Sequence, residues 1–418
     1  MRKIQTPAIL FAALLAACSS VPPTVAPVST APAPLPAPTP VAQQCAPCTA
    51  CPVCPAVQPA PAAAPAFTRS YVAAAWADLP GWRDDDVAAA WPAFLQSCRG
   101  VRSKPQGPGW KRVCELAAAA DGKPGFDVRQ FFEQHLQPWV VTNGDGASSG
   151  LVTGYYEPLL RGSRQRSKAY AQPVRGVPDD LLTIDLSAVF PELKDKRVRG
   201  RLEGNKVLPY SSRAEIEARG DSLRSKNLLY VDDAIELFFL QVQGSGRVQL
   251  PDGGMVRLNY ADQNGHPYQS IGRVLVERGE LKLEEASMQG IQAWARANPA
   301  RLDALLNSNP SYVFFREVAN GDGGPLGALG VPLTAERSIA VDPRAVPLGS
   351  PVFLATTRPN STTPMNRLVM AQDTGGAIKG AVRADFFWGF GKAAGEQAGR
   401  MKQSGRVWVL LPPELAPK

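Results

Sequence analysis

The stretch that most constrains the fold lies near the end of the chain. Ala-Gln-Asp-Thr-Gly-Gly-Ala-Ile-Lys-Gly spans residues 371–380, and Arg-Ala-Asp-Phe-Phe-Trp-Gly spans residues 383–389. Asp373 and Asp385 therefore stand on either side of a glycine-rich turn, and Asp342 closes the apolar run Ser-Ile-Ala-Val-Asp further upstream. Acids at the ends of strands, beside tight turns and aromatic side chains, suit acid chemistry on a neutral polymer.

Short β-type runs separated by glycine and proline surround this stretch. The runs expected as strands cover residues 151–156, 206–208, 236–244, 247–250, 255–258, 312–316, 338–341, 351–355, 368–372 and 406–411. Helical patterns at 270–278 and 284–297 interrupt them. Short strands at this density favour barrels over an open parallel sheet.

The folded part begins with helices over residues 84–136. Apolar residues recur there at intervals of three and four, as expected for one buried helix face. These residues are Val87, Trp91, Leu95 and Cys98. A second helix is expected over 110–120, and a third should begin at Asp127, whose side chain can cap free amides, and bury Phe131 and Phe132. Cys98 and Cys114 lie in two of these helices, and we expect a disulfide across the hairpin.

The N-terminus has the pattern of an exported lipoprotein. Arg2 and Lys3 precede an apolar run at 9–17, which is too short to span a bilayer and is typical of a signal peptide over residues 1–18. Leu-Ala-Ala-Cys at its end resembles a bacterial lipobox, with Cys18 as the lipidated residue. Ser19 follows, where an Asp would resemble an inner-membrane signal, so we expect an outer-membrane lipoprotein facing the periplasm.

Residues 19–66 are mostly Pro, Ala, Thr, Val and Ser, which cannot bury a core and favour an extended tether. This segment also contains four cysteines at Cys-x-x-Cys spacing. They are Cys45, Cys48, Cys51 and Cys54. In an oxidising compartment we expect disulfides or labile thiols there in preference to a metal site.

Several classes of function are disfavoured by composition. The net charge of +8 comes without a Lys/Arg run or an aromatic–basic motif, so nucleic acid is not an expected partner. The only histidines, His135 and His266, have no metal-ligand spacing and no Gly-x-Ser-x-Gly elbow beside them. Asp373-Thr374-Gly375 is a tripeptide of aspartic proteases, but the second copy that such a dyad needs is missing. Carboxylates without a metal or cofactor remain as the expected catalysts.

Two further segments suggest a sugar-binding surface. Tyr155 and Tyr156 are neighbours on an expected strand and would point to opposite faces, one to stack on a ring and one inward. In Leu-Phe-Phe-Leu-Gln-Val-Gln-Gly-Ser-Gly, residues 237–246, a strand would place Gln241 and Gln243 on one face. Gly244 and Ser245 follow there, and glycine lets a ligand approach the backbone. An ordinary half-exposed strand with a glycine turn is the competing interpretation.

Many ordered motifs make the chain similar to the membrane-bound lytic murein transglycosylase A family, from about residue 67 to 412. They include Thr-Gly-Tyr-Tyr at 153–156, Gln-Val-Gln-Gly-Ser-Gly at 241–246 and Asp-x-Gly-Gly-Ala-Ile-Lys-Gly at 373–380. Asp342, Asp373 and Asp385 resemble the three aspartates that name the C-terminal 3D region.

The resemblance implies a mainly β fold with N-terminal helices. A double-psi β-barrel domain would comprise residues 67–162 and 313–412, with its C-terminal part as the 3D region. A second, β-barrel-like domain would be inserted at 163–312, with a glycan groove between the two.

The implied activity is non-hydrolytic cleavage of the β-1,4 bond between N-acetylmuramic acid and N-acetylglucosamine in peptidoglycan, leaving a 1,6-anhydro end. Asp385 matches the single catalytic acid and base, and Asp373 and Asp342 match its neighbours. Phe386, Phe387 and Trp388 are expected to desolvate Asp385, with the charge of Asp373 also raising its pKa.

Further expectations concern substrate-binding residues and partners. The residues expected to bind substrate are Tyr155, Tyr156, Gln241, Gln243, Gly244, Ser245 and Lys379. The expected partners are peptidoglycan strands, the outer membrane through the lipid anchor, and cell-wall synthesis complexes, and the chain is expected to be a monomer. A peptidoglycan hydrolase with two carboxylates and a non-catalytic wall-binding lipoprotein are the alternatives.

Overall fold

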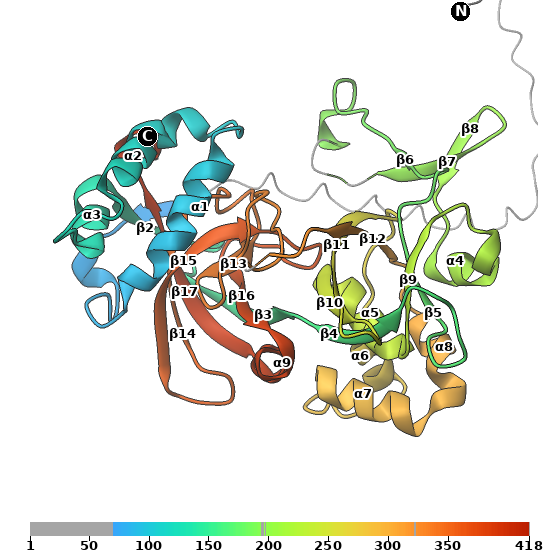
Figure 1. Cartoon of the computed structure of the whole chain (residues 1–418). Coiled ribbons are helices and arrows are strands. Elements are labelled where there is room, and N and C mark those ends of the chain that lie inside the picture. Colours follow the sequence, from blue (N-terminus) through green and yellow to red (C-terminus); the bar gives the residue numbers. More distant parts are fainter. Residues whose placement is uncertain (1–69, 194–195, 197, 322, 418) are drawn as a thin grey trace, which may run out of the picture. The chain divides into compact units, whose positions relative to one another are not determined.

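The computed structural model describes residues 70–193, 196, 198–321 and 323–417 (Figure 1). The predictions for the signal peptide with Cys18, the 19–66 tether and its four cysteines lie outside these residues. None of the helices in the described part of the chain is both long enough and apolar enough to cross a membrane.

An eight-stranded sheet carries the C-terminal region, in the order β1-β2-β17-β14-β15-β13-β16-β3. Its strands are β1 (Tyr71–Ala73), β2 (Gln137–Val141), β3 (Ser149–Glu157), β13 (Ser338–Val341), β14 (Pro351–Thr357), β15 (Pro364–Asp373), β16 (Arg383–Phe390) and β17 (Lys402–Leu411). β17 pairs with β3 as well as with β2 and β14. The pairs β13–β15 and β16–β3 are parallel and the others are antiparallel.

Four helices pack on this sheet. Three come from the segment before β2, and the fourth follows β16 and lies against β3 and β16. They are α1 (Trp91–Val101), α2 (Gly107–Ala120), α3 (Val128–His135) and α9 (Gly391–Arg400). The expected cap on α3 is confirmed, since the Asp127 carboxylate accepts hydrogen bonds from the backbone N–H groups of Arg129 and Gln130. Phe131 and Phe132 are buried as predicted. The disulfide between Cys98 and Cys114 is also present and joins α1 to α2.

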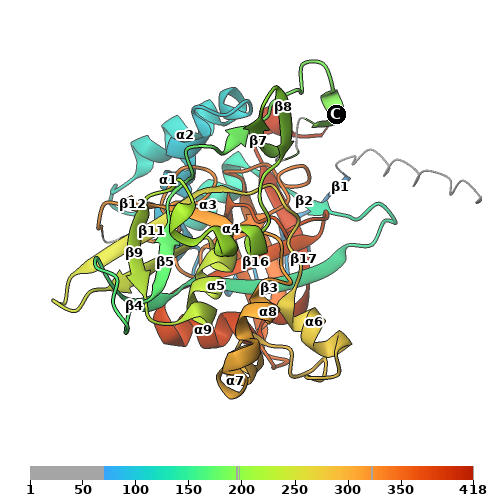
Figure 2. The same ribbon diagram turned by 90° about the vertical axis from the view of Figure 1, so that its right-hand side faces the viewer.

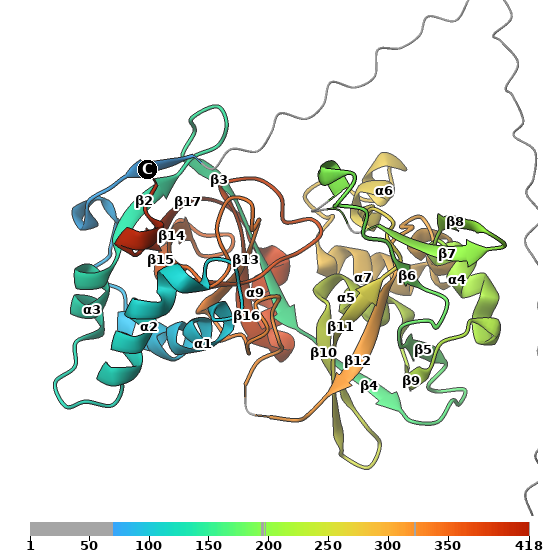
Figure 3. The same ribbon diagram turned by 90° about the horizontal axis from the view of Figure 1, so that it is seen from above.

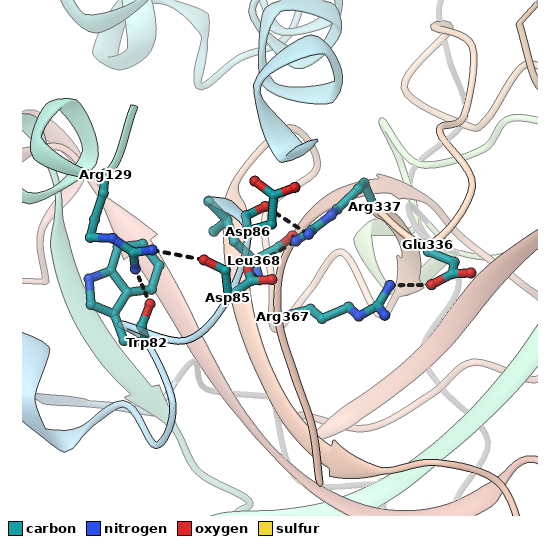
Figure 4. Close-up of polar contacts among 8 residues, drawn as sticks. All are labelled: Trp82, Asp85, Asp86, Arg129, Glu336, Arg337, Arg367 and Leu368. Carbon is teal, nitrogen blue, oxygen red and sulfur yellow. Dashed lines mark hydrogen bonds and ion pairs between the residues drawn. The ribbon is translucent and has the colours of Figure 1, made fainter. Parts of the chain in front are cut away.

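A buried polar network ties the segment before α1 to the large sheet (Figure 4). The Asp85 carboxylate accepts hydrogen bonds from the Arg337 guanidinium at 2.9 Å and from the backbone N–H of Leu368 at 2.8 Å. Arg337 also donates to the Asp86 carbonyl at 2.8 Å, and Arg129 donates to the Asp85 carbonyl at 2.8 Å. Buried charges need such full pairing, because an unpaired one carries its whole desolvation cost.

Residues 159–318 form a second sheet and a small third one. The second sheet runs β12-β11-β10-β4-β9-β5 and the third runs β6-β7-β8. Their strands are β4 (Leu159–Ser163), β5 (Gln172–Arg175), β6 (Leu182–Thr183), β7 (Arg199–Glu203), β8 (Lys206–Pro209), β9 (Asn227–Val231), β10 (Ser245–Gln249), β11 (Met255–Gln263) and β12 (Val313–Val318). The chain runs from β3 directly into β4 and so joins the two larger sheets (Figure 3).

Five helices belong to this second region. They are α4 (Arg213–Arg219), α5 (Ala234–Gln243), α6 (Ile271–Glu277), α7 (Met288–Ala297) and α8 (Leu302–Leu306). α5 to α8 share one buried apolar cluster, and α6, α7 and α8 lie together in Figure 2. Short 3-10 helices occur at Trp76–Asp78, Val87–Ala90, Pro191–Leu193, Gly220–Ser222, Pro299–Arg301 and Pro413–Leu415.

The predicted strand over 236–244 is wrong, because this segment is helix α5. Asp233 caps its start by accepting from the backbone N–H of Ile235 at 3.0 Å, and Gly244, at φ +79°, ends it. The helix is apolar on two sides. Phe238 joins the cluster shared with α6 to α8, whereas Leu240 joins the core of the second sheet. A helix buried on both sides produces the same short apolar run as a strand.

Candidate active site

One face of the large sheet brings together two of the three aspartates. Asp373 ends β15 and Asp385 lies in β16, with β13 between these strands. Ala340 of β13 is the register partner of both aspartates. Their Cα atoms are thus two strand spacings, or about 10 Å, apart. Because register partners share a face, the small Ala340 side chain lies between the two acids and leaves space there.

The adjacent strand adds two more side chains to this face. Thr153 of β3 is the register partner of Asp385, and Tyr155 follows two positions later. The Thr153 hydroxyl is hydrogen-bonded to Oδ1 of Asp385. The Tyr155 hydroxyl donates to Oδ2 of Asp373 at 3.1 Å. β3 therefore contacts both acids.

Burial raises the pKa of Asp385 above its ordinary value, while the hydrogen bond from Thr153 and the charge of Arg383 act against this rise. The expected contribution of the aromatic run is correct only in part. Phe387 faces the site against Tyr155, with ring centroids 5.1 Å apart, whereas Phe386 and Trp388 belong to the main core. The like charge of Asp373 is not among the causes of the shift at Asp385.

Asp373 is also held with a raised pKa. Burial raises the pKa of Asp373 from 3.8 to about 6, and the charge of Asp385 adds a minor contribution in the same direction. Three donors oppose the rise: the backbone N–H groups of Ala328 and Thr374 and the hydroxyl of Tyr155. The like-charge effect expected at Asp385 is thus found at Asp373, and it is small beside burial.

Asp342 is in a different environment from the other two. It is buried, and its carboxylate accepts hydrogen bonds from the Arg344 guanidinium at 2.6 and 3.0 Å and from the backbone N–H of Gly380 at 3.0 Å. Burial alone would raise its pKa, but these donors outweigh burial and lower it. Asp342 therefore stays ionised and anchors the end of the glycine-rich turn.

The paired tyrosines point to opposite faces as predicted, but both are buried. Tyr155 lies in a small cluster with Ala340 and Phe387, whereas Tyr156 belongs to the main core. The Tyr156 backbone N–H donates to the Gln243 side-chain oxygen at 3.1 Å. Both rings are therefore largely covered, which leaves little ring surface for stacking on a sugar.

A cavity of about 290 Å³ opens beside Thr153, between β3, α5, the start of α7, α9 and β17. Its walls are mainly apolar. They comprise Leu151, Thr153, Gly154, Tyr156, Phe239, Val242, Gln243, Ala286, Ser287, Met288, Ala398, Gly399, Met401 and Lys402. Of the residues expected to bind substrate, Tyr156 and Gln243 line this cavity.

The other residues expected to bind substrate are dispersed. Gln241 does not share a face with Gln243, because α5 is a helix, and its side-chain oxygen accepts a hydrogen bond from Arg213. Arg213 is itself buried between the rings of Phe238 and Tyr312. Gly244 is the left-handed end of α5, Ser245 begins β10 and is buried, and Lys379 is exposed in the glycine-rich turn.

Thr153 and Arg383 also belong to the site, although the sequence predicted no role for either residue. The Arg383 guanidinium donates to the Thr153 hydroxyl at 2.8 Å. Arg383 and Asp385 are two positions apart, so alternation along a strand would have indicated a shared face. Within the described residues, no three or more His, Cys, Asp or Glu side chains are grouped so as to hold a metal ion.

A β-rich fold with two partly buried carboxyls of raised pKa on one sheet face is typical of enzymes that use acid–base chemistry, as carbohydrate-cleaving enzymes do. Comparison with known proteins narrows this class. Residues 151–316 match the family model of the MltA specific insert domain, and residues 337–411 match that of the 3D domain. The chain belongs to the membrane-bound lytic murein transglycosylase A family, which confirms the resemblance and the expectation of an enzyme.

Individual relatives match most of the chain in sequence and in structure. The chain is 34% identical over 297 residues to membrane-bound lytic murein transglycosylase A of Escherichia coli K12, covering 69% of this chain and 73% of that protein. MltA from Neisseria gonorrhoeae matches with a TM-score of 0.73 at 41% identity, over 83% of this chain and 94% of that one. Escherichia coli MltA with bound chitohexaose matches with a TM-score of 0.63 at 28% identity, over 84% and 96% of the two chains.

Proposed function

We propose that this protein is a peptidoglycan lytic transglycosylase that cleaves the β-1,4 bond between N-acetylmuramic acid and N-acetylglucosamine and leaves a 1,6-anhydro end. The observation that carries the proposal is the environment of Asp385, a carboxyl whose pKa burial raises while Thr153 and Arg383 support its ionised form. The chitohexaose bound to the Escherichia coli relative supports a glycan as ligand.

In the first half of the reaction, Asp385 acts as general acid. Its proton passes to the glycosidic oxygen as the bond from that oxygen to C1 of the muramic acid breaks. A raised pKa lets Asp385 hold its proton to higher pH than an ordinary aspartate does, which suits it to act as an acid. The Thr153 hydroxyl then stabilises the carboxylate that remains.

In the second half, the same carboxylate acts as base. The 6-hydroxyl oxygen of the muramic acid attacks C1, and its proton passes to Asp385, which returns to its starting state. No water is consumed, so no second carboxylate is required to activate one, unlike in a hydrolase. Asp373, with three donors on its carboxylate, suits a supporting role beside the glycan better than that of a base.

Roles for the remaining predicted residues follow from their positions. We assign Asp342 to holding the glycine-rich turn through Gly380, and Tyr155 to orienting Asp373. Tyr156 and Gln243 are proposed to bind glycan in the cavity, and Lys379 to contact it from the turn. Gln241 and Ser245 would act through the backbone that they support, because both side chains are buried.

The double-psi β-barrel also remains a proposal. The pairing of β17 with β3, at the far end of the sheet order, supports it. We keep the domain limits of 67–162 with 313–412, and 163–312 for the insertion. The glycan groove would lie between them, where the cavity beside Thr153 receives residues from both.

Location and partners are proposed from the sequence. The relatives are named membrane-bound. Lipidation at Cys18 would hold the protein on the periplasmic side of the outer membrane as a monomer, and the 19–66 tether would let it reach the wall and any synthesis complexes there.

The test is digestion of purified peptidoglycan sacculi by the detergent-solubilised full-length protein, with mass spectrometry of the released muropeptides. We expect anhydro-muramic products from the wild type and none from Asp385→Asn. Reducing-end products would instead identify a hydrolase. Binding without release would identify a non-catalytic wall-binding lipoprotein.

A further inference from the structure

Arg383, Thr153 and Asp385 form a chain of hydrogen bonds across the parallel strands β16 and β3. Arg383 and Asp385 project from the same face of β16, and Thr153 of β3, the register partner of Asp385, is hydrogen-bonded to both side chains. Arg383 Nη2 donates to Thr153 Oγ1 at 2.8 Å, and Thr153 Oγ1 is in turn bonded to Asp385 Oδ1.

The direction of this chain is set by chemistry. A guanidinium has donors and no acceptor, so Thr153 must accept from Arg383 and has its single hydroxyl proton left to donate. The other nitrogen of the fork, Nη1, donates to the carbonyl oxygens of Leu151 and Ala384, which holds the guanidinium in place. Thr153 can therefore offer Asp385 Oδ1 a donor in every state of the reaction.

The two oxygens of Asp385 are thereby made different. Oδ1 accepts the hydrogen bond from the Thr153 hydroxyl, while Oδ2 has no hydrogen-bond partner within the described part of the chain. We infer that Arg383 and Thr153 are positioning residues that keep Oδ1 as the unprotonated oxygen throughout, so that Oδ2 alone carries the proton to the glycan and takes it back. This inference rests on the proposed function and deepens it.

Burial and the hydrogen bond from Thr153 act on the pKa of Asp385 in opposite directions, which suits this one residue to act as acid and then as base. Burial favours the protonated form of Asp385, which the first half-reaction needs. The donor from Thr153 favours the carboxylate, which the second half-reaction needs. Removing the donor is expected to raise the pKa of Asp385 further and so to hinder the first half-reaction, in which Asp385 gives its proton to the glycosidic oxygen.

The test compares Thr153→Val, which removes the hydroxyl at nearly constant shape, with Thr153→Ser, which keeps it. Because a charged hydrogen bond is lost, we expect Thr153→Val to lower kcat on sacculi by about 10- to 100-fold with little change in KM. The alkaline limb of the pH–rate profile of Thr153→Val should move to higher pH. Thr153→Ser should stay near wild type, and Arg383→Gln should move the limb in the same direction as Thr153→Val.

A control variant separates this role from general strand stability. Thr356→Val removes another largely buried hydroxyl, on β14. This hydroxyl donates to the backbone carbonyl of Ser404 in β17 at 2.8 Å. This variant should leave the pH profile in place. An alkaline limb that stays at its wild-type position in Thr153→Val, whatever the loss of rate, would overturn the inference.

A second readout does not depend on activity. The melting temperature of Asp385→Asn minus that of its parent should rise with pH until Asp385 is fully ionised and then level off. In the Thr153→Val background this levelling should occur at higher pH, and an unchanged position would contradict the inference. If the wild type releases no anhydro products while this shift is present, the proposed function fails, and only the hydrogen bond from Thr153 to Asp385 and its effect on the pKa of Asp385 stand.

Discussion

Asp373 and Asp342 are both conspicuous aspartates at strand ends, but their surroundings act on them in opposite directions. Asp373 is buried, and no cationic side chain offsets the effect of burial on its pKa, which rises to about 6. Asp342 has Arg344 and two backbone donors, and its pKa falls. Residue type and spacing alone do not distinguish them, because the difference comes from the groups that the fold brings to each carboxylate.

Replacing Asp373 with Asn should stabilise the protein at neutral pH. The folded state keeps a proton on Asp373 up to about pH 6, whereas the unfolded chain loses it near 3.8, so the free energy of unfolding falls as the pH rises between these values. The gain in the free energy of unfolding of Asp373→Asn is at most about 3 kcal/mol above this pH range, and it vanishes below the range. Urea denaturation at the two ends of the range measures it.

Asp342→Asn is the matched contrast. The pKa of Asp342 is lowered on folding, so its carboxylate contributes stability that is present above its unfolded pKa and is lost as the pH falls. This variant should be destabilised at neutral pH and approach wild type in acid. The same direction of change in both variants at neutral pH would mean that the two environments are not as described.

At the scale of elements, the disulfide between α1 and α2 bridges a sequence separation of 16 residues. For a loop of this size, loss of the disulfide should lower the free energy of unfolding by about 3 kcal/mol. We expect a Cys98→Ala, Cys114→Ala double variant to show this loss in denaturant titrations. Adding reductant should lower the stability of the wild type and leave the double variant unchanged, and a matching loss in both would point to an effect other than this bond.

The packing of α9 on the large sheet depends on Gly154. A Cβ atom at this position would come within 2.6 Å of the Trp388 indole nitrogen and 2.9 Å of the Ala398 Cα atom. Gly154→Ala should therefore lower the free energy of unfolding by about 1–3 kcal/mol through overpacking. Gly144→Ala is the control, since nothing lies within 4 Å of its added methyl group. Equal thermal stability of the two variants would contradict the tight contact.

At the scale of the whole molecule, the Asp85–Arg337 pair connects the N-terminal helices to the strands of the 3D region (Figure 4). Both side chains are buried, so Asp85→Ala leaves a buried guanidinium without its partner and should cost about 3–5 kcal/mol. Arg367→Gln, which breaks the more exposed pair with Glu336, should cost less than about 1 kcal/mol. Similar losses in the two variants would argue against a buried network.

Local sequence patterns were sufficient where one segment decides its own structure. Strands such as β9 and β16, the latter carrying Asp385, were not predicted. The helices near 84–136, the Asp127 cap and nine of the ten predicted strands follow from periodicity and capping chemistry, and the ordered motifs identify the family. Segment 236–244 is the exception. Its apolar residues are buried on two sides of a helix, and a short run of this kind cannot be distinguished from a strand by alternation.

The sequence by itself determined the family, the three aspartates and Asp385 as the acid to test. Only the tertiary structure decided that Ala340 separates Asp373 from Asp385, that Arg344 pairs with Asp342, and that Thr153 contacts Asp385. The physical reason is register. Strands from distant parts of the chain pair in one alignment among several, and that alignment, set by packing of the whole sheet, determines which side chains share a face.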